Sequence, residues 1–305
     1  MRLTTLAPAK VNLVLRVGPR RPDGYHEILT LMAPLDLADR VEVRIWPRAG
    51  PVTCLVPGHP ALAGPGNLAA RAAEAFRARF GIRRGVSIRI EKRTPVTAGL
   101  GGGSSDAAAV LRCLARAFGV RDRGALAEVA LSVGSDVPFF LGPGPAWAAG
   151  RGERLRPADL PRLDLVLLYP RDPSMAIRAA DGYRWLDEHR GRSAPRALGR
   201  PAPFRLSLAG NDLEGPCLAR RRGLRTHLGL LRGAGAGRAL MSGSGPAVFG
   251  VFPGPGAARR AALTMEKVIQ DSDLIAFVVR TVRRQPRVTP WRSPRSASSR
   301  SARRS

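Results

Sequence analysis

Pro95-Val96-Thr97-Ala98-Gly99-Leu100-Gly101-Gly102-Gly103-Ser104-Ser105-Asp106-Ala107-Ala108 is the stretch that decides the fold. Its glycines are followed by apolar residues at helical spacing, so the pattern predicts a glycine loop that enters a helix. We expect Ser104 or Ser105 to cap that helix and Asp106 to lie in its first turn. The free N–H groups and the positive dipole end of a helix N-terminus bind anions, usually phosphate. Glycines let the backbone approach the phosphate oxygens closely.

Residues that are missing from the loop and its surroundings exclude several known classes of phosphate site. A flexible Gly/Ser linker is the plain alternative, but such linkers are not normally joined to a periodic helix. No Lys follows the glycines, so the loop is not a Walker A sequence. The series Gly99-x-Gly101-x-x-Ser104 misses the third glycine of the dinucleotide fingerprint. No His-Arg-Asp or Asp-Phe-Gly set occurs elsewhere, which argues against a protein kinase.

The composition is that of a strongly basic globular chain. Its 305 residues allow one large domain or two ordinary ones, and 44% hydrophobic residues are enough for real cores. The formal net charge is +27, and the segment 283–305 holds eight Arg and no acid, so we expect this tail to be disordered. Such a charge leaves a basic RNA-binding protein as an alternative. However, no stacking-aromatic module or basic recognition helix is visible.

The cysteines and the N-terminus indicate the compartment. Cys54, Cys113 and Cys217 are far apart without metal-ligand spacing, so we expect buried thiols, no protein metal site and a reducing environment. The N-terminus lacks the pattern of a signal peptide, and no apolar run is long enough for a transmembrane helix. We therefore expect a cytoplasmic protein that does not bind membranes.

Side-chain chemistry is concentrated in three further places. Strand alternation over 10–17 puts Lys10 and Asn12 on the same face, where they can reach one ligand together. Lys10 is one of only three lysines in an Arg-rich chain, and a compact Lys marks a site that cannot accept Arg. The turn Pro22-Asp23-Gly24 delivers Tyr25 and His26. Asp136 is a lone carboxylate on a tight connection, where we expect Pro138 to keep Val137 out of the helical region.

Periodicity predicts the remaining elements. Strands followed by helices, without strict alternation, favour an α+β fold with a domain boundary near 150–162. We predict helices at 67–80, 123–133, 179–189 and 257–271, and strands at 27–35, 41–46, 86–90, 164–170 and 275–282. A second glycine-serine turn at 242–245 leads into a strand.

Four separated segments together resemble the GHMP small-molecule kinases: Pro8–Leu13, Arg21–His26, the 95–108 loop and the 241–249 segment. The 21–26 turn, Asp136–Phe140 and Asn211–Glu214 narrow the resemblance to the branch that phosphorylates a CDP-linked methylerythritol in the non-mevalonate route to isoprenoid precursors. The resemblance covers residues 3 to about 282. It implies a ribosomal-S5-like N-terminal domain (1–155) and a ferredoxin-like C-terminal domain (156–282), with ligands in the cleft between them.

The resemblance also implies roles for single residues. The catalytic pair of the family matches Lys10 and Asp136. Its ATP site, with Mg²⁺ carried by ATP, matches Asn67, Lys92, Pro95, Val96, Thr97, Ala98, Gly99, Leu100, Gly101, Gly102, Gly103, Ser104 and Ser105. Its substrate site matches Asn12, Tyr25, His26 and Tyr183, while Ser242, Gly243, Ser244 and Gly245 could form a turn that closes over the phosphates.

One position departs from the family pattern. Ala179 stands where Thr is usual, so a hydroxyl contact near the substrate would be absent. A homoserine or mevalonate kinase of the same family is the alternative, but the Tyr25-His26 turn favours the CDP-linked alcohol. A monomer and a homodimer both remain compatible with the sequence.

Overall fold

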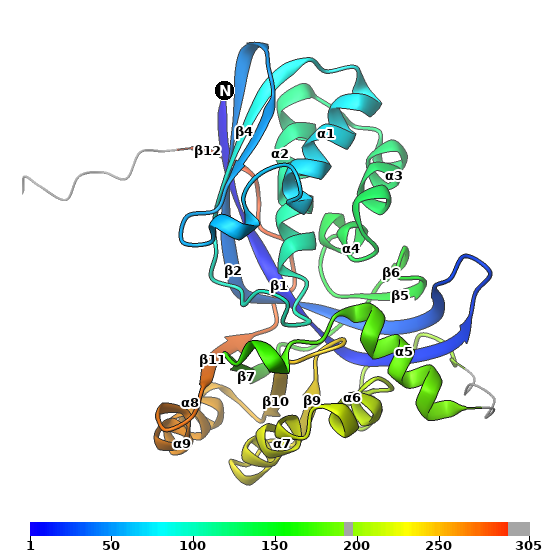
Figure 1. Ribbon diagram of the computed structural model, residues 1–305, viewed down its shortest axis with the longest axis vertical. Helices are drawn as coiled ribbons and strands as arrows, with labels where there is room; N and C mark the ends of the chain where they lie inside the picture. The colour runs from blue at the N-terminus through cyan, green and yellow to red at the C-terminus, as the bar shows by residue number, and fades with distance from the viewer. Residues whose placement is uncertain (192–197, 292–305) are drawn as a thin grey trace, which may run out of the picture.

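The computed structural model describes residues 1–191 and 198–291, in which two sheets are each covered by helices (Figure 1). The first sheet has the central order β12-β1-β2-β4-β3, with β5, β6 and β8 attached at its sides. Its strands are β1 (Arg2–Arg20), β2 (His26–Ala49), β3 (Val52–Leu55), β4 (Arg84–Glu91), β5 (Ala146–Gly150), β6 (Arg154–Pro157), β8 (Gly210–Asn211) and β12 (Thr289–Pro290).

The second sheet is antiparallel and has the order β11-β7-β10-β9. Its strands are β7 (Asp164–Pro170), β9 (Arg238–Met241), β10 (Val248–Phe252) and β11 (Leu274–Arg280). The first domain contains the helices α1 (Leu68–Phe80), α2 (Gly102–Phe118), α3 (Arg123–Val133) and α4 (Val137–Leu141). The second contains α5 (Ala179–Arg190), α6 (Glu214–Arg220), α7 (Gly223–Gly233), α8 (Pro255–Thr264) and α9 (Glu266–Gln270). The α+β fold predicted from the sequence is confirmed.

Strands β1 and β2 form a long antiparallel pair that leaves the first domain and runs along the second (Figure 1). The strands predicted at 27–35 and 41–46 are therefore parts of one strand. The register shifts between Pro8 and Lys10 and again between Asn12 and Val14. Between these two irregularities the stretch from Lys10 to Asn12 pairs in regular register with β2, so Lys10 and Asn12 lie on the same face.

Three apolar cores hold the chain together, and one of them lies between the two sheets. In the first domain α1 and α2 pack on the sheet through residues such as Phe76 and Leu111. Between the sheets, Val11 and Leu13 of β1 share a core with Leu165 and Leu167 of β7. The alternate residues of β7 point into the third core, beneath the helices of the second domain. Strand β1 is thus sandwiched between the domains, and both of its faces near Lys10 are buried.

Four local predictions are wrong. Helix α2 begins at Gly102 with Gly101 as its N-cap, so neither Ser104 nor Ser105 caps it and Asp106 lies beyond its first turn. Gly101 takes a positive φ of 68°, which turns the chain into the helix without a side-chain cap. Val137 is helical after all, because Pro138 falls in the first turn of α4, where a missing N–H costs nothing. The helix predicted over 257–271 is broken into α8 and α9 at Met265.

Residues 283–291 correct the expectation of a wholly disordered tail. Strand β12 pairs with the β1 edge, with Thr289 opposite Thr4. Half-buried Arg112 donates to the carbonyl of Pro286 at 3.2 Å, and the guanidinium of Arg2 lies 3.3 Å over the ring of Trp291. These contacts could not be predicted from the composition of the segment, because its partners belong to the folded first domain. The rest of the expected tail, 292–305, lies outside the described residues.

We expect a chain ending at Val282 to be less stable than a chain ending at Trp291. The shorter chain loses the β12 pairing, the acceptor for Arg112 and the Arg2–Trp291 contact. Hydrogen bonds contribute about 1 kcal/mol each, so a loss of about 2 kcal/mol should lower the melting temperature by about 4–8 °C. Calorimetry of the two truncated chains measures this difference. Equal melting temperatures would mean that the segment adds nothing to stability.

Candidate active site

Two adjoining cavities meet at the glycine loop between β4 and α2. The larger one has a volume of about 810 Å³ and the smaller one about 480 Å³. Both are lined by Thr97, Gly99, Gly101 and Ser104, which therefore form the wall between them. A ligand in one cavity can thus touch a ligand in the other across the glycine loop.

Most of the residues predicted for the site line one of these cavities. The larger cavity collects Lys10, Asn12, Tyr25, His26, Asp136, Ala179, Tyr183, Gly243 and Ser244. The smaller cavity collects Asn67, Lys92 and the loop residues from Pro95 to Ser104. Ser105, Ser242 and Gly245 are not among the lining residues of either cavity. Ser105 is fully buried in α2, whereas Ser242 and Gly245 support the second glycine turn.

The glycine loop is a cradle that other residues could not form. Gly99 and Gly101 have φ values of 75° and 68°, in the left-handed region. A Cβ on Gly99 would collide with the carbonyl oxygen of Ser242, and one on Gly101 would lie 3.1 Å from the Lys10 side chain. No side chain caps α2, so the N–H groups of its first turn are available to an anion.

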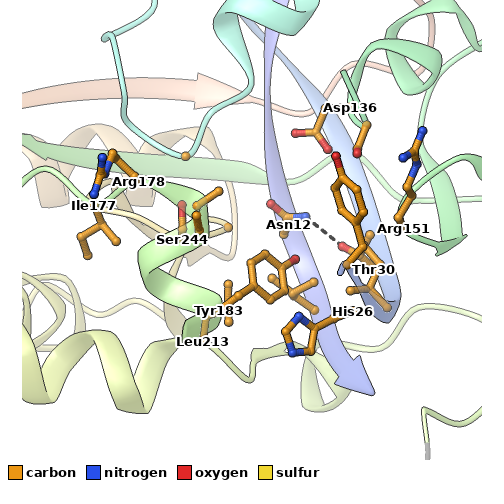
Figure 2. Close-up of a pocket in the computed structure, with 18 of the residues that line it drawn as sticks. Asn12, His26, Thr30, Asp136, Arg151, Ile177, Arg178, Tyr183, Leu213 and Ser244 are labelled. Atoms are coloured by element: carbon orange, nitrogen blue, oxygen red, sulfur yellow. Dashed lines mark hydrogen bonds between the residues drawn. The ribbon is translucent and has the colours of Figure 1, made fainter. Parts of the chain in front are cut away.

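Lys10 is the centre of a buried hydrogen-bond network. Its Nζ donates to Asn12 Oδ1 at 2.6 Å and to the carbonyl of Gly99 at 3.0 Å, and it lies 3.6 Å from Asp136 Oδ2. The amide of Asn12 donates in turn to Thr30 Oγ1 at 2.8 Å (Figure 2). The network fixes the ammonium group between the glycine loop and Asp136. Lys10 and Asp136, 126 positions apart in the sequence, are thus brought together.

Asp136 is the accessible member of this pair. Its side chain is 38% exposed, whereas that of Lys10 is only 5% exposed. It stands at the N-cap position of α4 but makes no side-chain capping hydrogen bond. The structure therefore does not support helix capping as the role of this carboxylate. A hydroxyl group in the larger cavity can reach Asp136 while Lys10 lies behind it.

An aromatic group lies at another part of the larger cavity. His26 and Tyr183 are stacked, with ring centroids 5.2 Å apart and planes at 16° (Figure 2). His26 Nε2 lies 2.9 Å from Asp187 Oδ1. Burial raises the pKa of the Tyr183 phenol, and the charge of Asp136 adds to the effect. Tyr25 is 48% exposed, and the guanidinium of Arg151 lies 4.8 Å from its ring centroid. Each tyrosine thus already has one stacking partner within the protein.

The second glycine turn, Ser242–Gly245, belongs to the second domain and packs against the glycine loop of the first domain. We name it the closing turn. Ser242 Oγ donates to the carbonyl of Gly99 at 3.1 Å, and the N–H of Ala247 donates to the carbonyl of Ala98 at 3.2 Å. Gly243 and Gly245 take positive φ values of 56° and 81°. The two glycine segments, far apart in the sequence, form one wall of the larger cavity.

Lys92 lines the smaller cavity but is engaged by two carboxylates. Its Nζ donates to Asp39 Oδ2 at 2.5 Å and to Asp106 Oδ2 at 2.9 Å. Burial by itself would lower the pKa of Lys92, but the two carboxylates outweigh it and raise that pKa. Burial also raises the pKa of Asp106 to about 7, although the charge of Lys92 opposes the shift. This buried cluster fastens β2 and β4 to the start of α2.

Asn67, the other predicted residue of the smaller cavity, is mostly occupied as a helix cap. Its Oδ1 accepts from the N–H of Ala69 at 2.8 Å, and its Nδ2 donates to the carbonyl of Leu62 at 2.8 Å. These bonds fix the start of α1 beside the cavity. One amide N–H is left for a ligand.

Several residues that shape the larger cavity were not predicted from the sequence, among them Thr30, Arg151 and Asp187. Asp187 could have been found, because it follows Tyr183 by four positions on a predicted helix and therefore shares its face. Thr30 and Arg151 carried no local signal. They reach the cavity through the pairing of β2 with β1 and through the turn after β5.

Two family models match the chain. The model described as GHMP kinases N terminal domain matches residues 67–144, and the one described as GHMP kinases C terminal matches residues 206–270. Thus the first match includes the glycine loop and Asp136, and the second includes the closing turn. Within the part of the chain that the structure describes, no helix is long and apolar enough to cross a membrane.

Relatives match over nearly the whole chain. A protein of Anaeromyxobacter dehalogenans (strain 2CP-C), named 4-diphosphocytidyl-2-C-methyl-D-erythritol kinase, is 72% identical and covers 100% of this chain and 99% of its own. A protein of the same name from Geobacter metallireducens is 41% identical, with 92% and 99% covered. The similarity therefore includes both domains.

Solved structures are similar to this chain over both domains as well. A crystal structure of 4-(cytidine 5'-diphospho)-2C-methyl-D-erythritol kinase is 37% identical, has a TM-score of 0.72 and covers 92% of this chain and 99% of its own. A homoserine kinase from Cytophaga hutchinsonii shares the fold with a TM-score of 0.70 at 17% identity, with 94% and 97% covered. The fold is thus shared by kinases of different names.

Proposed function

Because this chain belongs to the GHMP kinase family, we propose that it transfers the γ-phosphoryl group of ATP to the 2-hydroxyl of 4-diphosphocytidyl-2-C-methyl-D-erythritol. The relatives at 72% and 41% identity carry the name of that kinase. In the structure, the observation that carries the proposal is the contact of Lys10 and Asp136 beside the wall shared by two cavities. One cavity is suited to the phosphoryl donor and the other to its acceptor.

The smaller cavity is proposed to hold ATP. The glycine cradle and the uncapped start of α2 fit the triphosphate, because glycines with positive φ let the backbone turn sharply towards the phosphates and the first-turn N–H groups are available to them. ATP supplies the phosphoryl group, and Mg²⁺ carried on its phosphates neutralises part of their charge. Residues 1–191 and 198–291 contain no group of three or more His, Cys, Asp or Glu side chains arranged to hold a metal ion. We propose that Mg²⁺ enters the site with the nucleotide, bound to its phosphates.

Asp136 and Lys10 are proposed to act on the acceptor hydroxyl. Phosphoryl transfer depends mainly on positioning and charge neutralisation. Asp136 is exposed to the larger cavity and accepts the hydroxyl proton, while Lys10, 3.6 Å from Asp136, offsets negative charge on the transferring group. Lys10 is itself fixed by Asn12 and Gly99, so the cation need not reorganise during the reaction.

The cytidine group is proposed to lie near Tyr25, His26 and Tyr183. Tyr25 and Tyr183 would stack on the two faces of the cytosine, and His26 would contact the edge of the base. Because His26 covers one face of Tyr183 in this structure, the contact with the base edge requires His26 to leave this stack. Ala179 lines the same cavity without the hydroxyl that the family usually has at this position.

The proposal is tested by ATP turnover against a panel of alcohols. We expect phosphorylation of 4-diphosphocytidyl-2-C-methyl-D-erythritol, and at most traces with homoserine or mevalonate. Efficient turnover of homoserine or mevalonate, with none of the CDP-linked alcohol, would contradict it.

The proposal includes a cytoplasmic location. The three cysteines, Cys54, Cys113 and Cys217, are buried and unpaired, which supports a reducing compartment. Monomer and homodimer both remain compatible with it.

Replacing Tyr25 by Ala should raise the Michaelis constant for the CDP-linked substrate and spare that for ATP. Stacking is worth about 1–3 kcal/mol per base, so we expect an increase of about one to two decades. Steady-state kinetics with each substrate varied in turn provides the measurement. Trp46→Ala is a matched control, because Trp46 is 40% exposed and also carries a guanidinium, that of Arg44, 3.7 Å over its ring. An increase confined to the ATP constant would place Tyr25 elsewhere.

A further inference from the structure

The segment Asn211-Asp212-Leu213-Glu214 has no role in the proposed chemistry, although it connects the strand of Lys10 to the closing turn. It starts in β8, which pairs in parallel with β1 so that Asn211 lies opposite Leu15. The N–H of Asp212 donates to the carbonyl of Leu15 at 2.9 Å. The segment is therefore fixed to the same strand that carries Lys10.

The side chain of Asn211 reaches the closing turn and uses all of its donors there. Its Nδ2 donates to the carbonyl of Met241 at 2.9 Å and to that of Gly243 at 2.7 Å. Its Oδ1 accepts from the N–H of Leu213 at 2.9 Å. Asn211 is only 9% exposed, so these partners replace the water that the amide loses on burial.

A second contact holds Met241, the residue that leads into the closing turn. Glu214 Oε2 accepts from the N–H of Met241 at 2.8 Å, so Met241 is held at its N–H by Glu214 and at its carbonyl by Asn211. Met241 is the last residue of β9, directly before the closing turn. The backbone that enters the turn is thus set by two side chains of one short segment.

The position of Gly243 matters because Lys10 lies next to it. A Cβ built on Gly243 would be 3.2 Å from Asn12 Oδ1 and 3.4 Å from Lys10 Nζ. The carbonyl that Asn211 holds therefore belongs to a residue in close contact with the Lys10 network. A displacement of Gly243 by an ångström would change the space above Lys10, where the transferring phosphoryl group is proposed to pass.

We infer that Asn211 is a positioning residue for phosphoryl transfer, which it serves by holding the closing turn against Lys10. This inference rests on the proposed function. Asn meets the hydrogen-bonding needs of this position, because its amide has two N–H donors for the two carbonyl oxygens and one oxygen that accepts from the N–H of Leu213. An Asp at this position would keep the acceptor but direct a carboxylate at two carbonyl oxygens.

The test compares Asn211→Asp and Asn211→Ser with the wild-type chain and with Asp212→Asn. Asp212 belongs to the same segment, but its carboxylate accepts from the N–H of Val17 at 3.0 Å and contacts Arg16 and Arg190 rather than the closing turn. For each chain we would measure kcat with the CDP-linked substrate and the affinity for cytidine monophosphate by calorimetry. Cytidine monophosphate is chosen because it probes the His26–Tyr183 end of the cavity without needing the turn.

A displaced turn should lower kcat by about 10- to 100-fold in both Asn211 variants, because misplacement by an ångström can cost that much. Cytidine monophosphate affinity should stay within about twofold, and Asp212→Asn should keep kcat within about threefold. Unchanged kcat in Asn211→Ser, or a joint loss of kcat and cytidine monophosphate affinity, would overturn the inference. If Asn211→Asp does not fold, the uncharged Ser variant decides. A wild-type chain that does not phosphorylate the CDP-linked alcohol would instead contradict the proposed function.

Discussion

Asp136→Asn is expected to lower kcat by roughly 10²–10⁴ while leaving ATP affinity intact. The amide has the same shape but cannot accept the hydroxyl proton. ATP affinity should survive because Asp136 lines the larger cavity and not the smaller one. Steady-state turnover and calorimetric titration with a non-hydrolysable ATP analogue measure the two quantities. Near-wild-type turnover would exclude Asp136 as the base.

The same experiment extends to Lys10, because the two side chains are only 3.6 Å apart. Lys10→Arg keeps the charge, but the wider fork does not fit among Asn12, Gly99 and Gly101, so we also expect a severe loss of turnover. The double variant should be much less than multiplicatively worse, since both residues act on one event. Lys267→Arg is the matched control, because Lys267 lies in α9 and lines neither cavity. Full multiplicativity would show that the pair does not act as a unit.

The second large effect is expected for Gly101→Val, which should abolish measurable ATP binding. The new side chain would press on Lys10 and Phe140, each 3.1 Å from the site of its Cβ, and would fill the cradle of the phosphates. Calorimetry with the ATP analogue gives the affinity, and the melting temperature reports on the fold.

Gly119→Val provides the control for backbone strain. Gly119 caps the other end of α2 with a φ of 67°, close to the 68° of Gly101, but nothing lies within 4 Å of its Cβ site. We expect both variants to lose stability, and only Gly101→Val to lose ATP. Unchanged ATP affinity in Gly101→Val would mean that the phosphates bind elsewhere.

The parts of the site that the sequence could predict are those with a local signal. Period-two alternation placed Lys10 and Asn12 on one face, and their 2.6 Å hydrogen bond confirms this. The density of glycine before a periodic run predicted a loop entering a helix, which is also confirmed. The predicted start of that helix was wrong because a glycine with positive φ, Gly101, occupies the N-cap position where we expected a serine.

The parts that could not be predicted depend on distant partners or on weak periodicity. The partner of His26 is 161 positions away, and the Asn211 amide reaches backbone 30 and 32 positions away. No window of the sequence contains both members of such a contact. Helix α7 was missed because it contains Gly223, Gly229 and Gly233, which weaken any helical pattern. The roles assigned to the site residues stay predictions until the variants are measured.

The core between the two sheets limits how the enzyme can move during turnover. Spreading the sheets apart would bring Val11, Leu13, Leu165, Leu167 and Phe249 into water, and each is fully buried. Exposing each such side chain costs about 1.5–3 kcal/mol, so the five together would cost about 8–15 kcal/mol. This is as large as the whole folding free energy of an ordinary domain, about 5–15 kcal/mol. Complete separation of the two sheets is therefore strongly disfavoured, and we expect substrates to enter and products to leave through smaller motions at the rims of the cavities.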